Sequence, residues 1–213
     1  MDTVATDGLR ETKKRRTRAT IAAVAMELFT ARGFDAVTVA EIARAAGVSE
    51  KTVFNYFPAK EDLVFERGQE RQAALLEAVR NRPAGASLLE PFREQTMAFL
   101  DQVERDPPAS ILAVGRLVMG STALRDRLFL AWERQADALV PAVARDAGVA
   151  EDDLVAQMVA RVLGATHRLV YRAAFTRLMA GDDQRTVAAD LRRQAGMAYD
   201  QLEGGLGGYG RRG

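Results

Sequence analysis

The run from Ser49 to Tyr56 (SEKTVFNY) holds the side chains whose types and spacing best suit a chemical role. Hydroxyl groups, a carboxylate, an ammonium group and an amide lie there within eight residues. Groups of these kinds bond phosphate oxygens and read base edges in the major groove of DNA. Because they add little to an apolar core, we expect this run to contact a partner outside the protein. Its outward-facing members would be Ser49, Glu50, Lys51, Thr52, Asn55 and Tyr56.

The residues around this run have the spacing of a helix-turn-helix. In segment 39–58 the fifth residue, Ala43, is small enough for a second helix to cross it, and the ninth, Gly47, accepts the positive φ of a turn. The fourth, tenth and fifteenth positions are apolar and would lock the two helices together. Spacing alone leaves open a plain three-helix packing unit whose solvated face is polar. The locking residues are Ile42, Val48 and Val53.

The whole chain reads as helical, so the expected fold class is all-α. Apolar residues recur every three or four positions, glycine or proline separates the helices, and no segment alternates as a strand would. Thr38 and Glu41 form a capping box, and Ser49 caps the next helix. About nine helices are expected, at 17–32, 38–46, 49–56, 60–81, 87–104, 109–119, 122–147, 151–180 and 183–203.

Charge and composition restrict the classes of function. Lysine and arginine number 30 against 29 acidic residues, but residues 10–60 carry ten basic and five acidic side chains, a local excess of +5. This excess favours a nucleic-acid partner for the amino-terminal part. The chain has no cysteine and one histidine, and no catalytic set or metal-ligand spacing is visible. We therefore expect no enzyme, no metal site and no cofactor.

The two ends and the hydropathy pattern complete this outline. Residues 1–16 are polar and end in KKRR, which predicts a flexible basic arm, and residues 204–213 are glycine-rich, which predicts a disordered tail. The longest stretch without a charged residue, 107–115, has nine residues, well short of the about 20 that cross a bilayer. We expect a soluble, cytoplasmic protein without a membrane span.

Residues 15–67 also resemble a known family. A helix, an ARGF turn, the run TVAEIARAAGVS and the segment YFPAKEDL are similar to the amino-terminal domain of TetR-family (TetR/AcrR-type) transcriptional repressors. The rest of the chain agrees only in the number and spacing of its helices. The resemblance implies a DNA-binding domain at 17–67 and a ligand-binding and dimerisation domain at 68–203. It also implies a homodimer that places its two third helices in a palindromic, inverted-repeat operator on double-stranded DNA.

Carried over position by position, the resemblance assigns roles in DNA binding. Thr38 and Lys60 would contact phosphates at two helix amino termini, while Thr52 and Tyr56 would hold the DNA backbone. The full predicted interface is Thr38, Ser49, Glu50, Lys51, Thr52, Phe54, Asn55, Tyr56 and Lys60.

The segment from Lys51 to Ala59 contains the predicted base-reading residues and two departures from the family pattern. Lys51 would favour guanine acceptors and Asn55 adenine. Phe54 stands where tyrosine is usual, which predicts a phosphate bond lost or replaced by packing on a sugar or thymine methyl. Ala59 stands where serine is usual, which predicts a weakened cap on the fourth helix.

The larger domain would hold a small, largely apolar effector. Apolar bulk in its fifth to seventh helices could line a pocket, although filling a core is the commoner use of such residues. The single histidine could hydrogen-bond an effector, although a lone histidine is more often a satisfied interior group. The predicted pocket residues are Phe99, Arg116, Met119, Trp132, His167 and Arg172.

Stripes of small and apolar residues on the last two predicted helices suit a two-fold four-helix dimer interface, and they suit an internal core equally well. The predicted interface residues are Val159, Val162, Leu191, Ala195, Ala198 and Leu202.

The predicted mechanism depends on the spacing of two recognition helices, about 34–36 Å for successive major grooves. An effector that binds better when the fourth helix is displaced would spread the pair and release DNA. Two alternatives are a transcriptional activator of the same fold and a helical adaptor that binds proteins instead of DNA.

Overall fold

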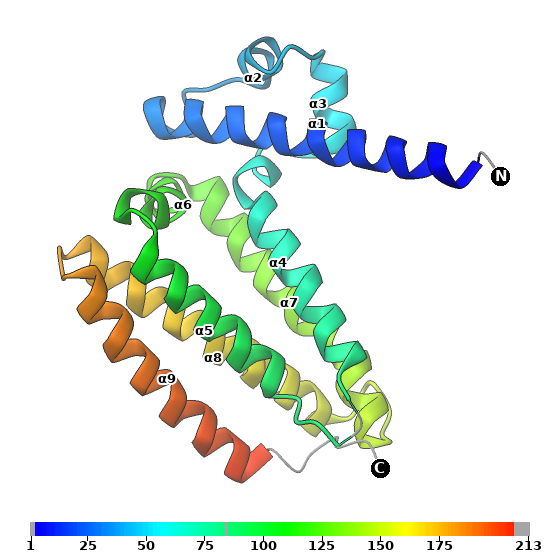
Figure 1. Cartoon of the computed structure of the whole chain (residues 1–213), viewed down its shortest axis with the longest axis vertical. Helices are drawn as coiled ribbons and strands as arrows, with labels where there is room; N and C mark the ends of the chain where they lie inside the picture. Colours follow the sequence, from blue (N-terminus) through cyan, green and yellow to red (C-terminus); the bar gives the residue numbers. More distant parts are fainter. Residues whose placement is uncertain (1–2, 84, 207–213) are drawn as a thin grey trace. The chain divides into compact units, whose positions relative to one another are not determined.

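The computed structural model describes residues 3–83 and 85–206, without the side chains of residues 3–11 and 206. This part of the chain is helical and contains no strand, as the sequence predicts (Figure 1). Its helices are α1 (Thr3–Arg32), α2 (Val39–Ala45), α3 (Glu50–Tyr56), α4 (Asp62–Asn81), α5 (Glu90–Arg105), α6 (Pro108–Gly120), α7 (Thr122–Ala147), α8 (Leu154–Met179) and α9 (Gln184–Leu206).

Most helix ends follow local signals in the sequence. Gly47, Gly148 and Gly181 have φ values of 67°, 69° and 89°, the left-handed conformation that ends a helix. At each of them two backbone amides fold back onto carbonyls of the last turn. The predicted capping box of Thr38 and Glu41 and the cap at Ser49 are confirmed.

The structure differs from the prediction at the two ends of the chain. The predicted flexible arm, residues 1–16, is wrong from Thr3 onward, because α1 begins there and runs unbroken to Arg32. Residues 9–18 (LRETKKRRTR) are rich in good helix formers, so their polarity does not prevent a helix that the next apolar stretch anchors. The predicted tail, 204–213, is helical as far as Leu206, and residues 207–213 lie outside the described part.

The chain divides into two compact units. Unit 1 contains the described residues up to Gln69 together with Arg116–Arg127, and unit 2 contains Glu70–Gly115 and the chain from Leu128 onward. The sequence boundary at 67 gave no indication that 116–127 would group with the first unit. Its contacts explain the grouping: Ser121 donates a hydrogen bond of 3.2 Å to Asp35, and Arg127 pairs with buried Asp62.

The core of unit 1 joins α1 to the helix pair that follows it. Phe29 on α1 lies 5.0 Å, centroid to centroid, from Phe34, and both rings are buried. Of the three residues expected to lock the helix-turn-helix, Ile42 and Val53 are buried as predicted. The third, Val48, is only half-buried.

In unit 2, α5, α8 and α9 pack side by side around two apolar clusters (Figure 1). One cluster contains Phe92, Leu139 and Leu163, and the other contains Leu100 and Leu191. Burying such side chains stabilises the fold by roughly 1.5–3 kcal/mol each.

A buried ion pair holds the end of α4 to the end of α7. Arg82 lies 2.7 Å from Asp146, and both side chains are almost fully buried. Arg82 also donates to the Val79 carbonyl at 2.8 Å, which is an orphan acceptor at the end of α4, and to the Ala86 carbonyl in the following connection at 3.1 Å.

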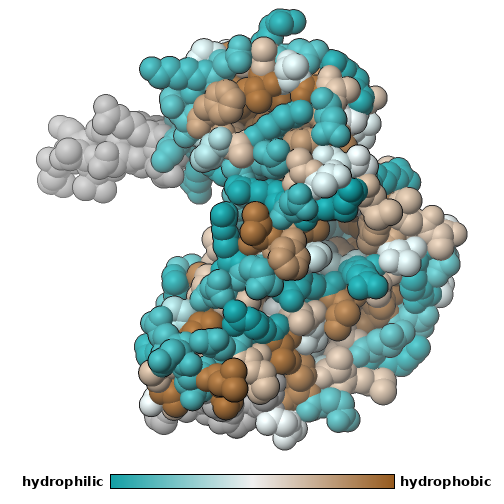
Figure 2. Space-filling model, turned by 180° about the vertical axis from the view of Figure 1, so that it is seen from behind, coloured by the Kyte–Doolittle hydropathy of each residue, from teal (hydrophilic) through white to brown (hydrophobic). Residues whose placement is uncertain are grey.

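The surface of the protein is mixed. On the face drawn in Figure 2, hydrophobic residues are interrupted by hydrophilic ones. None of the helices in the described ranges is long and apolar enough to span a bilayer.

Candidate nucleic-acid interface and effector region

α3 is fixed to unit 1 by one face and leaves the other face open. Val53 and the residue after the helix, Phe57, are each 1% exposed and pack into the core. Lys51, Phe54 and Asn55 point the other way and are exposed. A rigid helix of two turns with a free polar face is the arrangement that major-groove reading requires.

Ser49 and Thr52 form a hydroxyl pair at the start of α3. The Ser49 Oγ accepts a hydrogen bond from the Thr52 amide at 3.1 Å and lies 2.8 Å from the Thr52 hydroxyl. The bond between the two hydroxyls uses the proton of one of them. The proton of the other hydroxyl can therefore bond a phosphate oxygen. Of the other predicted contacts, Glu50 is exposed and Tyr56 is half-buried.

The turn before α3 explains the position of Gly47. Its amide bonds the Arg44 carbonyl at 3.2 Å, and the Val48 amide bonds the Ala43 carbonyl at 3.0 Å. This pair of bonds requires a positive φ at the glycine, which a side chain would strain. The turn therefore fixes the angle at which α3 leaves α2.

Arg18 connects three parts of unit 1, and the sequence analysis missed it. Its guanidinium pairs with both carboxylate oxygens of Glu66 on α4, donates to the Tyr56 carbonyl at 2.6 Å, and lies 4.4 Å from the centre of the Phe57 ring. Glu66 is 5% exposed. Arg18 therefore holds the last turn of α3 between α1 and α4, and nothing local in the sequence indicates that.

Thr38 and Lys60, two of the predicted phosphate contacts, form hydrogen bonds within unit 1. The Thr38 hydroxyl donates its only proton to Glu41 at 2.9 Å, which leaves none for a phosphate. Hydrogen bonds from the Thr38 amide, then from Arg32 and the Thr38 hydroxyl, lower the pKa of Glu41 to about 2. Glu41 is thus ionised and holds the cap at any physiological pH.

Lys60 folds back onto the core of unit 1. Its ammonium group donates to the Phe34 carbonyl at 2.7 Å and lies 4.2 Å from the Phe34 ring centre. Burial lowers its pKa, against the attraction of nearby carboxylates. A phosphate contact by Lys60 stays a prediction, and it would compete with these bonds.

The start of α4 compensates for Ala59. Asp62 accepts a hydrogen bond from the Ala59 amide at 3.1 Å, and α4 begins at Asp62, two residues after the predicted start. The carboxylate thus replaces part of the cap that a serine would provide.

A groove of about 620 Å³ runs between α1 and the α2–α3 turn. Its polar lining comes from the first half of α1 and includes the exposed cations Lys13 and Arg16. Hydroxyl and cationic groups on one open surface suit an anionic strand. The lining residues are Thr12, Lys13, Arg16, Thr17, Thr20, Ile21, Ala46 and Val48.

Comparison with known proteins identifies the family. Residues 21–66 match the family model of bacterial regulatory proteins of the tetR family. The HTH-type transcriptional regulator TcmR of Streptomyces glaucescens is 32% identical over 176 residues, which cover 80% of this chain and 78% of TcmR. The chain belongs to the tetR family.

Solved structures agree with this fold. GusR of Salmonella enterica is similar, with a TM-score of 0.54 and 25% identity over 89% of this chain and 94% of GusR. A SmeT–triclosan complex shares the fold, with a TM-score of 0.57 and 17% identity over 89% of this chain and 91% of SmeT. The chain is therefore an all-helical transcriptional regulator with a helix-turn-helix DNA-binding domain.

The six predicted pocket residues of this tetR-family regulator are divided between the two units, so a pocket that they share stays a prediction. Arg116 and Met119 are exposed and belong to unit 1. The other members Phe99, Trp132 and His167 lie in unit 2. Tyr171 contacts both Phe99 and His167, and Arg168 lies over the Trp132 ring. Arg172, also in unit 2, is exposed on α8.

His167 belongs to a buried polar network in unit 2. Its Nδ1 lies 2.7 Å from the Thr96 hydroxyl, which lies 2.8 Å from the Tyr199 hydroxyl, and Tyr199 donates to the Phe92 carbonyl at 3.2 Å. Burial, then the charges of Arg71 and Arg168, lower the pKa of His167 to about 4. The imidazole is therefore neutral at pH 7.

Aromatic rings and arginines adjoin His167. The Tyr171 ring lies 4.6 Å from the imidazole and stacks on Phe99, with 3.6 Å between centroids. Burial raises the pKa of the Tyr171 phenol, against the opposing charge of Arg71 on α4. The Arg168 guanidinium lies 5.5 Å from the centre of the Trp132 ring. The sequence did not single out any of these neighbours. Thr96 and Arg71 come to His167 only through the fold, whereas Arg168 and Tyr171 lie one and four residues after it on α8 and could have been found from their spacing.

The predicted dimer interface needs correction at three positions. Val159, Leu191 and Ala195 are at most 4% exposed and belong to the core of unit 2, so they offer almost no surface to a partner. The alternative reading as internal core holds for them. Val162 and Leu202 are half-buried and Ala198 is exposed, so an interface role for these three stays a prediction.

Proposed function

We propose that this regulator is a repressor: a homodimer binds an inverted-repeat operator, and a small effector releases it. The observation that supports DNA binding best is α3, whose buried Val53 fixes the helix while Lys51 and Asn55 remain exposed on its far side. Lys51 would bond guanine and Asn55 adenine, and the Ser49–Thr52 pair would bond phosphate.

The basic first half of α1 would add affinity without sequence preference. Lys13 and Arg16 line the open groove beside the α2–α3 turn, and phosphate attraction at such a surface falls steeply with salt. Arg18 is fixed by Glu66 and would keep α3 at the angle at which it enters the major groove of DNA.

The dimer would form through exposed apolar residues of α8 and α9. Leu154, Met158 and Leu169 occupy one stripe of α8, and Leu154 and Leu169 are 79% and 62% exposed. Met197 of α9 is 64% exposed. Exposed apolar side chains of this size are costly in water, and a two-fold copy of the same helices would cover them.

Three helices pass from one unit to the other and would carry the effector signal. α4 crosses after Gln69, α6 at Gly115–Arg116 and α7 after Arg127. An effector that binds better to one arrangement of these helices shifts the population of DNA-competent dimers, by no more than its difference in affinity.

The test is a selection of bound duplexes from random DNA with the full chain, followed by fluorescence anisotropy on the selected site. We expect an inverted repeat and a steep loss of affinity with salt. Lys51→Ala should weaken specific binding by about 1–3 kcal/mol and relax one position of each half-site. Arg193→Ala, the same loss of charge on α9, is the matched control. Recovery of no inverted repeat, or equal effects of both substitutions, would refute the proposal.

A further inference from the structure

Arg168 on α8 is half-buried, and one nitrogen of its guanidinium is enclosed without a hydrogen-bond acceptor. Its Nη1 is inaccessible to solvent, and no described residue offers it a hydrogen bond. Glu133 attracts the guanidinium, but no ion pair forms within 4.0 Å. A guanidinium does not lose its proton in proteins, so the unsatisfied nitrogen costs free energy that an anion would recover.

The surroundings hold this charge in place. Gly164, one turn earlier on α8, has no Cβ, and an added one would lie 3.2 Å from Nη1. On the other side the guanidinium lies over the Trp132 ring of α7. Arg168 is therefore confined between its own helix and an aromatic ring, and it is not simply a solvated surface cation.

A second cation and several flat surfaces lie on the same part of unit 2. The Arg71 charge acts on both His167 and Tyr171, and the Tyr171 ring lies against His167 and Phe99. His167 is neutral, and none of the described residues hydrogen-bonds its Nε2. Two arginines, a neutral imidazole and aromatic rings suit a ligand that is flat, apolar over most of its area and negatively charged at one end.

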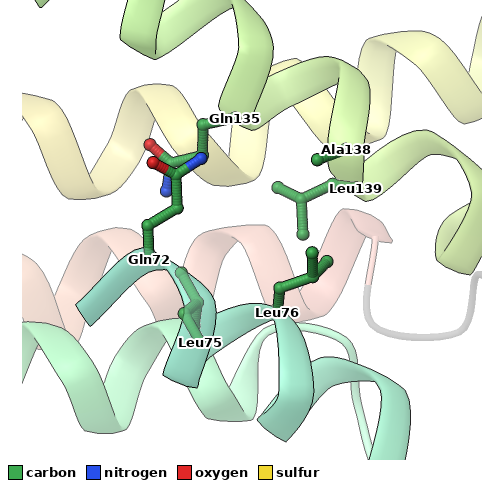
Figure 3. Close-up of a pocket in the computed structure, with 6 residues that line it drawn as sticks. All are labelled: Gln72, Leu75, Leu76, Gln135, Ala138 and Leu139. Carbon is green, nitrogen blue, oxygen red and sulfur yellow. The ribbon is translucent and has the colours of Figure 1, made fainter. Parts of the chain in front are cut away.

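The space between α4 and α7 is nearly filled. A hollow of about 10 Å³ lies there, where the Gln72 and Gln135 amides approach one another beside Leu75, Leu76, Ala138 and Leu139 (Figure 3). It holds about one water, whereas a small-molecule site needs about 300 Å³ or more. Arg71 lies on α4 and Trp132 on α7, so a ligand held between these two side chains would need α4 and α7 to move apart.

We propose that the effector is a planar aromatic anion, its carboxylate bound by Arg168 and Arg71 and its rings against Trp132 and Tyr171. This inference rests on the proposed function, because it assigns the chemistry of the effector. It refines the sequence prediction of a largely apolar effector by adding one negative charge. It also gives α4 a reason to move, since the ligand needs the space between α4 and α7.

The test uses two probes that differ only in charge, anthraquinone-2-carboxylate and anthraquinone-2-carboxamide. Trp132 is the only tryptophan of the chain, so quenching of its emission reports binding at this site. We expect the acid to bind the full-length protein at least ten-fold more tightly than the amide. Arg168→Met should abolish that difference, while Arg172→Met, an exposed arginine one turn further along α8, should leave it unchanged.

Arg71→Met provides a second variant that does not disturb a buried group, because Arg71 is exposed, and it should weaken acid binding several-fold. Equal affinity for acid and amide, unchanged selectivity in Arg168→Met, or no quenching by the acid would each overturn the inference. Operator release, followed by anisotropy in the same titrations, separates the two proposals. If the amide releases the operator as well as the acid does, the anion is wrong and effector control stands. If the acid binds at Trp132 and leaves the operator bound, the site stands and its regulatory role is wrong.

Discussion

His167 should make the stability of unit 2 depend on pH in a way that one substitution removes. It is the only histidine of the chain, 9% exposed and bonded to Thr96. Burial and two neighbouring arginines, Arg71 and Arg168, hold its pKa at about 4 instead of 6.5. Its neighbours Thr96 on α5 and Tyr171 on α8, and Tyr199 on α9 beyond Thr96, carry hydroxyls that stay neutral in this range.

The direction and the size of this pH dependence follow from proton binding by His167 in the folded and unfolded chains. Between pH 6.5 and 4 the unfolded chain binds a proton at His167 that the folded chain does not, so stability rises with pH in this window. The contribution is fully present above pH 6.5 and is lost as the pH falls towards 4. Each pH unit is worth about 1.4 kcal/mol, so lowering the pH from 7 to 5 should cost about 2 kcal/mol from this group alone.

Two measurements check this. The Cε1 proton of a single histidine gives one resolved NMR signal, whose titration in the folded protein should have its midpoint near pH 4. Urea unfolding at pH 7 and pH 5 should show about 2 kcal/mol more loss in the wild type than in His167→Gln, which keeps a hydrogen-bonding group towards Thr96 without titrating. A midpoint at pH 6 or above, or the same pH dependence in both proteins, would refute the reasoning.

Three further predictions concern stability. Arg82→Met should cost about 3–5 kcal/mol in urea unfolding, because it removes the buried ionic partner of the Asp146 carboxylate at the negative end of α7, and Asp146→Asn should cost clearly less. Gly115→Ala places a Cβ 2.0 Å from the Phe175 ring, so overpacking of about 1–3 kcal/mol should outweigh a helix-propensity gain of about 1 kcal/mol and lower the melting temperature. Thr38→Ala removes the cap of α2 and should destabilise unit 1 by about 0.5–2 kcal/mol, measured by urea unfolding.

Matched controls accompany these changes. Arg161→Met breaks an exposed ion pair with Asp137 and should cost at most about 1 kcal/mol. Gly196→Ala lies within α9 with open space around it, so it should be neutral or stabilising. Thr38→Ser keeps the capping hydroxyl and should behave as the wild type. An Arg82→Met cost no larger than that of Arg161→Met, or a Gly115→Ala gain equal to that of Gly196→Ala, would contradict the packing described for unit 2.

The sequence by itself determined the number of helices, most of their ends and the helix-turn-helix. Those features depend on residues within about four positions of one another: the capping box at Thr38, the positive φ of Gly47, and the apolar spacing that buries Ile42 and Val53. The polarity of residues 9–18 misled the prediction of a flexible arm, because helix propensity and polarity are separate properties.

Only the tertiary structure decided which polar groups meet. Arg18 and Glu66 are 48 residues apart in the chain, and Thr96 lies 71 residues from His167 and 103 from Tyr199, so no local spacing could pair them. The same limit applied to α8, where apolar residues such as Val159 and Leu169 look alike in sequence. Packing of α8 against α5 and α9 buries Val159 and leaves Leu169 exposed. Only one face of a helix packs on the core, and the tertiary structure determines which face that is.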